Sequence, residues 1–378
     1  MQGSAGRITA IARKEFIHIS RDWRMIVAVL VMPLFQLLLF AYAISFDVRN
    51  VPTVVYDADH SMQSRLYVAA ATNSGFFTIV GNVDSNASVD QAFNRGTARV
   101  AIVIAEGFGS DLAAGKAGHA TVLVDGSEPN SASLGRTYAL ALNNAFGRNV
   151  LSTWAATRGV SSAVGALDPR VRVWYNPERN SADFLVPGLM VVIIMIVTVM
   201  QTAVTLVRER DSGTLEQLLV SPLTRSELIL GKVIPWAILG FADTVMITAV
   251  SIVAFHVPLR GDVLVLGAAM FLFVLSSLSI GLVISAVAPS IESANMVALL
   301  VSFLPGFMLS GMAFPLASIP WFLRVISYLF PGRYMVDISR GVFLRGAGWP
   351  IMWPLVAELG IYAAIALGLA TLLNRKQA

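Results

Sequence analysis

The stretch VRERDSGTLEQLLVSPLTRSE, residues 207 to 227, follows directly on one apolar run and leads directly into another. Each run holds about 20 or more residues, the length that an α-helix needs to cross a hydrocarbon core of roughly 30 Å. The charged stretch is therefore predicted to join two membrane spans on one side of the bilayer.

The composition of the chain is that of an integral membrane protein. Of its 378 residues, 56% are hydrophobic and 13% are charged, and the mean hydropathy is +0.70, whereas about 25% of the residues in soluble domains are charged. The net charge of +4 does not indicate a nucleic-acid partner, because the basic residues flank apolar runs, where they anchor to anionic lipid headgroups. The absence of cysteine excludes disulfides and thiolate sites.

Six apolar runs are long enough to be transmembrane helices, so we expect a polytopic α-helical membrane protein. The spans are predicted at residues 25–46, 184–207, 228–255, 263–288, 295–314 and 351–373. The rest of the chain divides into an interfacial helix (1–24), an inserted α/β domain (47–183) and a short tail (374–378). Residues 184–373 hold spans two to six.

The distribution of lysine and arginine predicts the orientation. Eleven of them, counted in short segments, lie on the face that carries both termini, and five lie on the other face. Because basic residues are enriched in cytoplasmic loops, both termini are predicted to be cytoplasmic and the inserted domain extracytoplasmic.

Four of the five outer arginines lie in segment 315–346, which is too polar and too broken to be a seventh span. Pro331 and Gly332 divide it into pieces of about 10 to 15 residues, each too short to cross a bilayer at ~1.5 Å per residue. We expect a pair of re-entrant helices between the fifth and sixth spans, since irregular backbone is tolerated at membrane depth when protein surrounds it.

The first 24 residues predict an amphipathic helix on the cytoplasmic membrane surface. Its apolar stripe also holds a carboxylate, Glu15, for which we expect a basic partner near the following spans; contact with His18 or with water is the alternative. Signal-peptide cleavage after Ala41-Tyr42-Ala43 is disfavoured because the apolar run is too long. The apolar stripe of this N-terminal helix consists of Ile8, Ile11, Ala12, Phe16 and Ile19.

The inserted domain alternates strand-like and helix-like segments, which predicts a sheet with helices packed on it. It is expected either to contact an envelope partner or exit pathway, or to be a purely structural cap. Strands are predicted at 51–57, 76–83, 98–105, 120–127 and 171–177, and helices at 62–73, 89–95, 107–115 and 132–157.

Catalytic and metal-binding motifs are absent from the sequence. The four histidines, His18, His60, His119 and His256, are scattered and show no metal-ligand spacing. Asp57, Asp59 and Asp125 follow strands and are interpreted as turn residues.

Gly231-Lys232 resembles the end of a phosphate-binding loop. It is followed by Val233 and lacks the required upstream glycine, so the chain itself is expected to bind no nucleotide.

The opening stretch carries two successive capping boxes. Thr214 with Gln217 predicts the start of a short helix that Ser221 and Pro222 end, and Thr224 with Glu227 starts the third span. The segment 208–221 is thus predicted to be a rigid docking helix, with an ordinary interfacial loop as the alternative. The side chains expected to face outward are Arg208, Glu209, Arg210, Glu216 and Gln217.

The stretch RERDSGTLEQLLVSPLTRSELILGKVIP resembles the signature of type-2 ABC exporter permeases, the drug-efflux type that pairs with a separate ATPase. Segments 13–22, 123–132 and 309–346 resemble other parts of that family, so the likeness covers nearly the whole chain. The resemblance implies an interfacial helix and a coupling helix that dock the ATPase. The residues concerned are Arg13, Lys14, Glu15 and Asp22, and then Arg208, Glu209, Arg210, Gly213, Thr214, Leu215, Glu216, Gln217 and Leu218.

The same resemblance implies two permease chains and two ATPase subunits, with ATP and Mg²⁺ bound by the ATPase and no cofactor bound by this chain. By analogy it suggests a bacterial inner membrane, a periplasmic adaptor and an outer-membrane channel.

The substrate path is predicted from side chains in the spans. Asp243 lies in the third span, where a carboxylate is costly, so it is either part of a pathway or a helix-packing group. Aromatic and methionine side chains form either an adaptable apolar surface for substrate or ordinary lipid-facing and core packing. They are Phe184, Met190, Met195, Met200, Phe303, Phe307, Met308 and Met312.

The sequence therefore predicts the permease subunit of an ATP-driven exporter of hydrophobic or amphipathic molecules. An envelope sensor that uses the external α/β domain without an ATPase is the alternative. An intramembrane enzyme is disfavoured, because Asp243 has no second acidic residue within its own helix.

Overall fold

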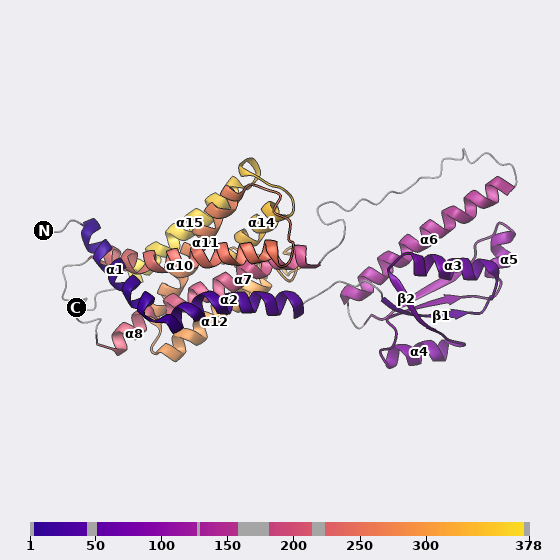
Figure 1. Cartoon of the computed structure of the whole chain (residues 1–378), viewed down its shortest axis with the longest axis horizontal. Coiled ribbons are helices and arrows are strands. Elements are labelled where there is room, and N and C mark those ends of the chain that lie inside the picture. The colour runs from indigo at the N-terminus through magenta and orange to yellow at the C-terminus, as the bar shows by residue number, and fades with distance from the viewer. Residues whose placement is uncertain (1–3, 44–50, 127–128, 158–180, 214–223, 374–378) are drawn as a thin grey trace. The chain divides into compact units, whose positions relative to one another are not determined.

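The computed structural model describes residues 4–43, 51–126, 129–157, 181–213 and 224–373 (Figure 1). The chain divides into two compact units, each described by itself below. The helical unit comprises Met1–Ser45 and Val173–Ala378, and the sheet unit comprises Phe46–Arg172.

The helical unit contains six described helices that are long and apolar enough to cross a membrane, which confirms the polytopic prediction. The short α1 precedes them, α8 continues α7 after a break at Val204, and α13 and α14 lie between the last two spans. The helices are α1 Ser4–Arg21, α2 Trp23–Ala43, α7 Ser181–Ala203, α8 Thr205–Asp211, α10 Arg225–Val253, α11 Val263–Val287, α12 Ile291–Met308, α13 Trp321–Ser327, α14 Pro331–Phe343 and α15 Trp349–Leu373.

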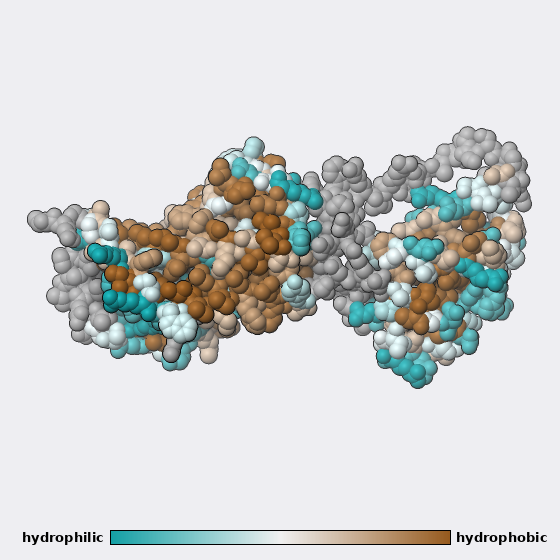
Figure 2. Space-filling view, in the orientation of Figure 1, coloured by the Kyte–Doolittle hydropathy of each residue, from teal (hydrophilic) through white to brown (hydrophobic). Residues whose placement is uncertain are grey.

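Helix α7 is the centre of the helical unit. It is apolar on all sides, and it packs against α2, α10, α11, α12 and α14. Of its most apolar stretch 72% is buried, against 28% in α12 and in α15. The outer helices therefore leave apolar surface exposed, as a helix that faces lipid does. Figure 2 shows hydrophobic residues over most of the visible face of this unit and hydrophilic residues gathered at the end formed by α1 and α8.

The segment between the last two spans forms two short helices, and α14 begins at Pro331. Helix α14 packs against α7, α11 and α15. Three of the arginines that disturb the charge distribution donate to backbone carbonyl groups: Arg340 to Gly311 and Met312 at 2.8 and 2.9 Å, and Arg324 to Leu316 and Ala317 at 3.1 and 2.9 Å. Arg333 donates to the carbonyl of Arg324 at 3.2 Å. These side chains satisfy the backbone of an irregular segment.

The sheet unit holds a four-stranded sheet of order β2-β1-β3-β4, in which β4 is antiparallel to β3 and the other pairs are parallel. The strands are β1 Val51–Asp57, β2 Phe77–Asn82, β3 Val100–Ile104 and β4 Ala120–Val124, and the helices are α3 Met62–Asn73, α4 Asn86–Asn94, α5 Phe108–Ala113 and α6 Pro129–Thr157. The strand expected at 171–177 lies outside the described residues.

The two faces of this sheet are covered by different helices. Residues of α3, α5 and α6, including Tyr67, Phe108 and Tyr138, pack with Val51 and Val55 of β1 into one core. On the other face, α4 packs against β1 and β3. The alternation of side chains along β1 thus builds two apolar cores from one strand.

Close approach of α7 and α11 requires glycine at position 281. A Cβ atom there would lie 2.0 Å from Thr202 Oγ1 and 2.4 Å from the carbonyl oxygen of Val199. We expect Gly281→Ala to cost about 1–3 kcal/mol through overpacking and to lower the temperature at which the detergent-solubilised protein loses its monodisperse size-exclusion peak.

The matched control is Gly267→Ala on the same helix, where the added Cβ meets no atom within 4 Å. Equal melting of the two variants would contradict the proposed close contact.

Candidate functional site

The carboxylate of Glu227, at the N-terminus of α10, forms hydrogen bonds that link α10 to α1. Its Oε2 accepts a hydrogen bond from the backbone N–H of Thr224 at 2.8 Å, and the Thr224 hydroxyl accepts from the N–H of Glu227 at 3.4 Å. This confirms the second predicted capping box. Arg7 and Ser4 of α1 both donate to Oε1 of Glu227 at 2.6 Å. One side chain thus caps α10 and holds α1 against it.

One turn further along α10, Lys232 forms the centre of a buried ion cluster. The side chain of Lys232 is 1% exposed, and its ammonium lies 2.7 Å from Oε1 of Glu209 in α8 and 3.3 Å from Oε1 of Glu15 in α1. Lys14, whose side chain is 57% exposed, lies 3.2 Å from the same two carboxylates. We call Lys14, Glu15, Glu209 and Lys232 the ion cluster; its formal charge is zero, and it joins three helices.

The ion cluster keeps Glu15 ionised. Burial favours the neutral carboxyl group, but the ammonium groups of Lys232 and Lys14 outweigh it and hold the pKa of Glu15 below its ordinary value. The expectation that Glu15 has a basic partner near the following spans is confirmed. Of the predicted apolar stripe of α1, Ile11 and Ile19 are buried against the rest of the helical unit, and Phe16 is 48% exposed.

Helix α1 and the spans also meet at a small residue. A Cβ atom at Gly231 would lie 2.6 Å from Cβ of Ile11. Glycine at this position therefore allows α1 to approach α10 closely, next to Lys232 of the ion cluster.

The prediction that Glu209 faces outward is wrong. Glu209 is 8% exposed because Lys232 holds its carboxylate between α8 and α10. Arg208 is exposed as predicted, and Arg210 donates to the carbonyl groups of Ala288 and Pro289 at 2.8 and 2.9 Å.

The predicted docking helix is described only in its first part. Gly213, with φ +70°, follows the end of α8 in the left-handed conformation that glycine adopts readily. The predicted helix start and docking residues Thr214, Leu215, Glu216, Gln217 and Leu218 lie outside the described residues.

Two further residues of the first helices have defined positions. Asp22 lies between α1 and α2, and its Oδ1 accepts a hydrogen bond from the N–H of Met25 at 3.1 Å, so it caps the start of α2. Arg13 lies exposed on α1.

The role of Lys232 was not predicted from the sequence, where this lysine counted only as a cytoplasmic basic residue and as part of an incomplete phosphate-binding loop. A usable signal was present: a lysine inside an apolar run needs a carboxylate partner, and Glu15 in the apolar stripe of α1 needs a basic one. Pairing the lysine of the third span with the glutamate of α1 predicts the contact between Lys232 and Glu15.

The candidate path residues are not gathered into one surface. Asp243 and Met195 are buried at 1% and 0% exposure, whereas Phe184, Phe303 and Met308 are at least 40% exposed. Both carboxylate oxygens of Asp243 are without a hydrogen-bond partner within the part of the chain that the structure describes.

The exposed aromatic residues have separate surroundings. Phe303 and Phe307 lie side by side on α12 with ring centroids 5.9 Å apart, and the guanidinium of Arg340 lies 3.9 Å from the ring centroid of Phe184. A shared substrate path stays a prediction.

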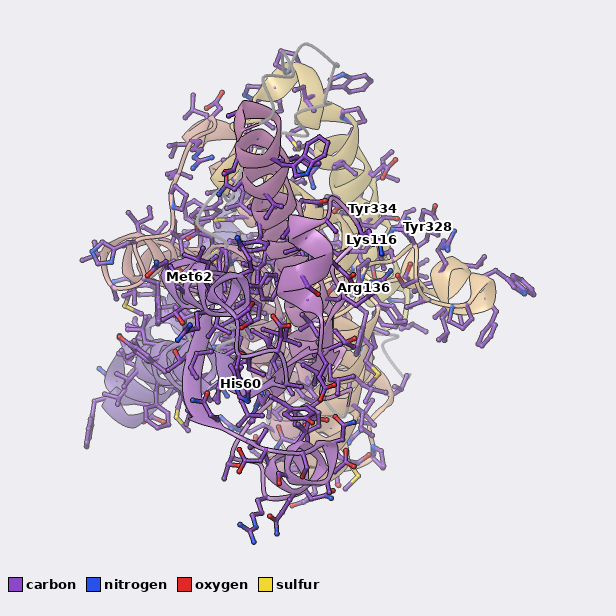
Figure 3. All side chains as sticks on the ribbon, turned by 90° about the vertical axis from the view of Figure 1, so that its right-hand side faces the viewer. His60, Met62, Lys116, Arg136, Tyr328 and Tyr334 are labelled. Carbon is purple, nitrogen blue, oxygen red and sulfur yellow. The ribbon has the colours of Figure 1, made fainter. Side chains whose placement is uncertain are left out.

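In the sheet unit, the aspartates at the end of β1 and in the turn that follows accept hydrogen bonds from backbone N–H groups, as predicted for turn residues. Asp57 Oδ1 accepts from the N–H groups of Asp59 and of His60 at 3.1 Å, and Asp59 Oδ2 accepts from the N–H of Gly109 at 2.9 Å. His60, labelled in Figure 3, has φ +50° in this turn. Among the described residues, no group of three or more histidine, aspartate or glutamate side chains is placed to hold a metal ion.

Comparison with known proteins gives one family. The family model described as ABC-2 family transporter protein matches residues 23–372. The probable multidrug ABC transporter permease YbhS of Escherichia coli K12 is 30% identical over 344 residues, 90% of this chain and 89% of that protein. The probable multidrug ABC transporter permease YbhR of the same strain is 27% identical over 93% of this chain and 94% of that protein. The inner membrane transport permease YhhJ is 30% identical over 84% of each chain.

Removing the central ammonium of the ion cluster leaves two buried carboxylates with only the largely exposed Lys14 as a nearby cation. We expect Lys232→Met to destabilise the protein by about 3–5 kcal/mol, measured as loss of the monodisperse peak on heating in detergent. Lys14→Met is the control, because a largely exposed lysine contributes about 1 kcal/mol or less. Neutralising Glu15 and Glu209 as glutamines in the Lys232→Met background should restore part of the stability. A Lys232→Met variant as stable as Lys14→Met would contradict this account.

The lowered pKa of Glu15 predicts an acid-sensitive contact. The stabilisation is fully present above the pKa of Glu15 in the unfolded chain and is lost as the pH falls through the lower pKa of the folded protein. Between about pH 5 and about pH 3, the wild-type protein should therefore lose more thermal stability than Glu15→Gln does. The exposed carboxylate variant Asp90→Asn should follow the wild-type curve; parallel curves for Glu15→Gln and wild type would refute the prediction.

Proposed function

The chain belongs to the ABC-2 transporter family, and from this we propose that it is the permease subunit of an exporter driven by a separate ATPase. It is a multi-pass membrane protein, and its family relatives are permease components. Export of hydrophobic or amphipathic, drug-like molecules across a bacterial inner membrane is the function that we assign to it. In this proposal ATP and Mg²⁺ bind to the ATPase, and the permease chain itself binds no cofactor.

The single observation that supports this function best is the ion cluster. An ATPase that displaces α1 or α8 has to move the spans as well. If these helices were only weakly attached to the spans, they would move without them. Lys232 ties Glu15 of α1 and Glu209 of α8 to α10, while α8 itself continues α7. Both docking helices are thereby joined to the two spans on either side of residues 207–227. Displacement at the ATPase tilts α7 and α10 together.

We assign the ATPase contact to α1 and to the residues that follow α7. Arg13 and Lys14 supply it on α1, and Arg208 with residues 213–218 supplies it after α7. The buried Glu15 and Glu209 support these helices from within, and Asp22 caps the start of α2. Two permease chains and two ATPase subunits complete the transporter, as the family implies.

The rest of the assembly follows from the charge distribution and from the relatives. Both termini lie in the cytoplasm, the sheet unit lies outside it, and α13 with α14 forms a re-entrant pair at the outer surface. A periplasmic adaptor and an outer-membrane channel receive the substrate. The path runs past Asp243 and the apolar side chains Phe184, Met195, Phe303, Phe307 and Met308.

The proposal is tested by purifying the full chain from native membranes in mild detergent and identifying stoichiometric partners by mass spectrometry. We expect one ATPase subunit per chain, lost in the double variant Glu216→Arg with Gln217→Arg because two added cations disrupt the docking surface. The control is the same change at Asp90 and Gln91, which are both exposed on α4 of the sheet unit.

Two outcomes would refute the proposal. Recovery of the chain without an ATPase, under conditions that preserve other such complexes, favours the sensor function of the external domain. Loss of the ATPase in the control as well as in the test variant shows that the docking surface is placed wrongly.

A further inference from the structure

A cavity of about 570 Å³ lies beside the ion cluster, bounded by α1, α2, α7, α8 and α10. All of these helices belong to the helical unit, and the cavity lies at the end of the bundle that carries α1 and α8. Its volume is within the ~300–1,000 Å³ range of small-molecule sites. Neither the transport function nor the family assignment gives it an occupant.

The polar side of the cavity has a surplus of positive charge. Lys14, Glu15 and Glu209 line it, but with Lys232 these groups neutralise one another. Arg208 also lines it and is exposed, and its guanidinium forms no hydrogen bond or ion pair with another described residue. His18 lines the cavity as well. The surplus therefore suits one anionic group.

The rest of the cavity lining is mostly apolar. Ile19 of α1, Met25 and Val29 of α2, and Met200 of α7 line it, together with the indole of Trp236. Methionine side chains adapt to flexible alkyl groups. An occupant that fits both sides has an anionic head and an apolar chain.

Two buried polar atoms on the cavity wall indicate that the head also forms hydrogen bonds. Trp236 is 6% exposed, and its Nε1 donor has no hydrogen-bond partner among the residues that the structure places. The same holds for the acceptor Oε1 of Gln201. Buried polar groups are nearly always paired, so two such atoms on one cavity point to a polar ligand.

We infer that this cavity binds an anionic phospholipid from the leaflet next to α1, with its phosphate against Arg208, His18 and the Trp236 Nε1 donor and one acyl chain against Met25, Val29 and Met200. Basic pockets between transmembrane helices bind such headgroups at the cytoplasmic surface. The bound lipid fills the space between α1 and α7, two helices that the ion cluster joins only indirectly, through α8. It is a structural ligand, separate from the transported molecule.

The test uses the full-length chain, delipidated in neutral detergent and mixed with phosphatidylglycerol or phosphatidylcholine of identical acyl chains, with retained lipid counted by native mass spectrometry. We expect about fivefold preference for phosphatidylglycerol, the factor that corresponds to roughly 1 kcal/mol for one basic side chain near an anionic headgroup. Arg208→Gln should abolish this preference. Trp236→Phe, which removes the donor and keeps the ring, should reduce retention about tenfold or more, as loss of a hydrogen bond to a charged group does.

The matched control is Arg21→Gln, an exposed arginine on α1 that does not line the cavity; it should retain phosphatidylglycerol like the wild type. Equal retention of the two lipids by the wild type would overturn the inference. So would an equal loss in Arg21→Gln and Arg208→Gln, because general surface charge then explains the binding. A transported amphiphile that displaces the lipid in competition would assign the cavity to substrate. None of these results depends on an ATPase, so the proposed function can fail independently.

Discussion

The helical unit depends on placing one ammonium group, that of Lys232, where water does not reach it. A buried lysine is tolerable only with carboxylates around it, and the two that serve come from segments far apart in the chain, at the N-terminus and after the second span. This requirement fixes where α1 lies, how α8 turns after α7, and which face of α10 points inward. Glu227 and Gly231, both N-terminal to the lysine in α10, make further contacts with α1.

Much of the fold follows from the sequence because each span carries its own signal. About 20 apolar residues without charge identify a transmembrane helix wherever they occur, and β-branched runs identified the strands of the sheet unit that the structure describes. The capping box at Thr224 was readable for the same reason: its two partners are three residues apart. Such features need no knowledge of distant contacts.

The site was less predictable, and Glu209 shows why. A glutamate in a charged segment is predicted to be exposed. Glu209 is buried instead because it pairs with Lys232 of another helix, a contact that the local sequence does not indicate. The sequence indicated that Glu15 lacked a partner, but not which basic residue would supply it. The arginines of segment 315–346 were also hard to interpret from the sequence. They depart from the expected distribution of basic residues because they donate hydrogen bonds to backbone carbonyl groups, and these contacts depend on the path of the chain. The scattered positions of Phe184, Met195 and Phe303 show that residue type alone does not define a pathway.

The spacing of the ion cluster along the chain has a consequence for biosynthesis. Glu15 is made first, Glu209 follows after the inserted domain and the second span, and Lys232 comes last. When α10 enters the bilayer, both of its counter-ions are already in place at the membrane surface. A lysine that reaches an apolar environment alone is costly, by about 2.5–3.5 kcal/mol at a helix centre on insertion scales. The carboxylate of the N-terminal helix is therefore already available to pair with Lys232 when the third span is inserted. The order of translation thus contributes to the assembly of the helical unit.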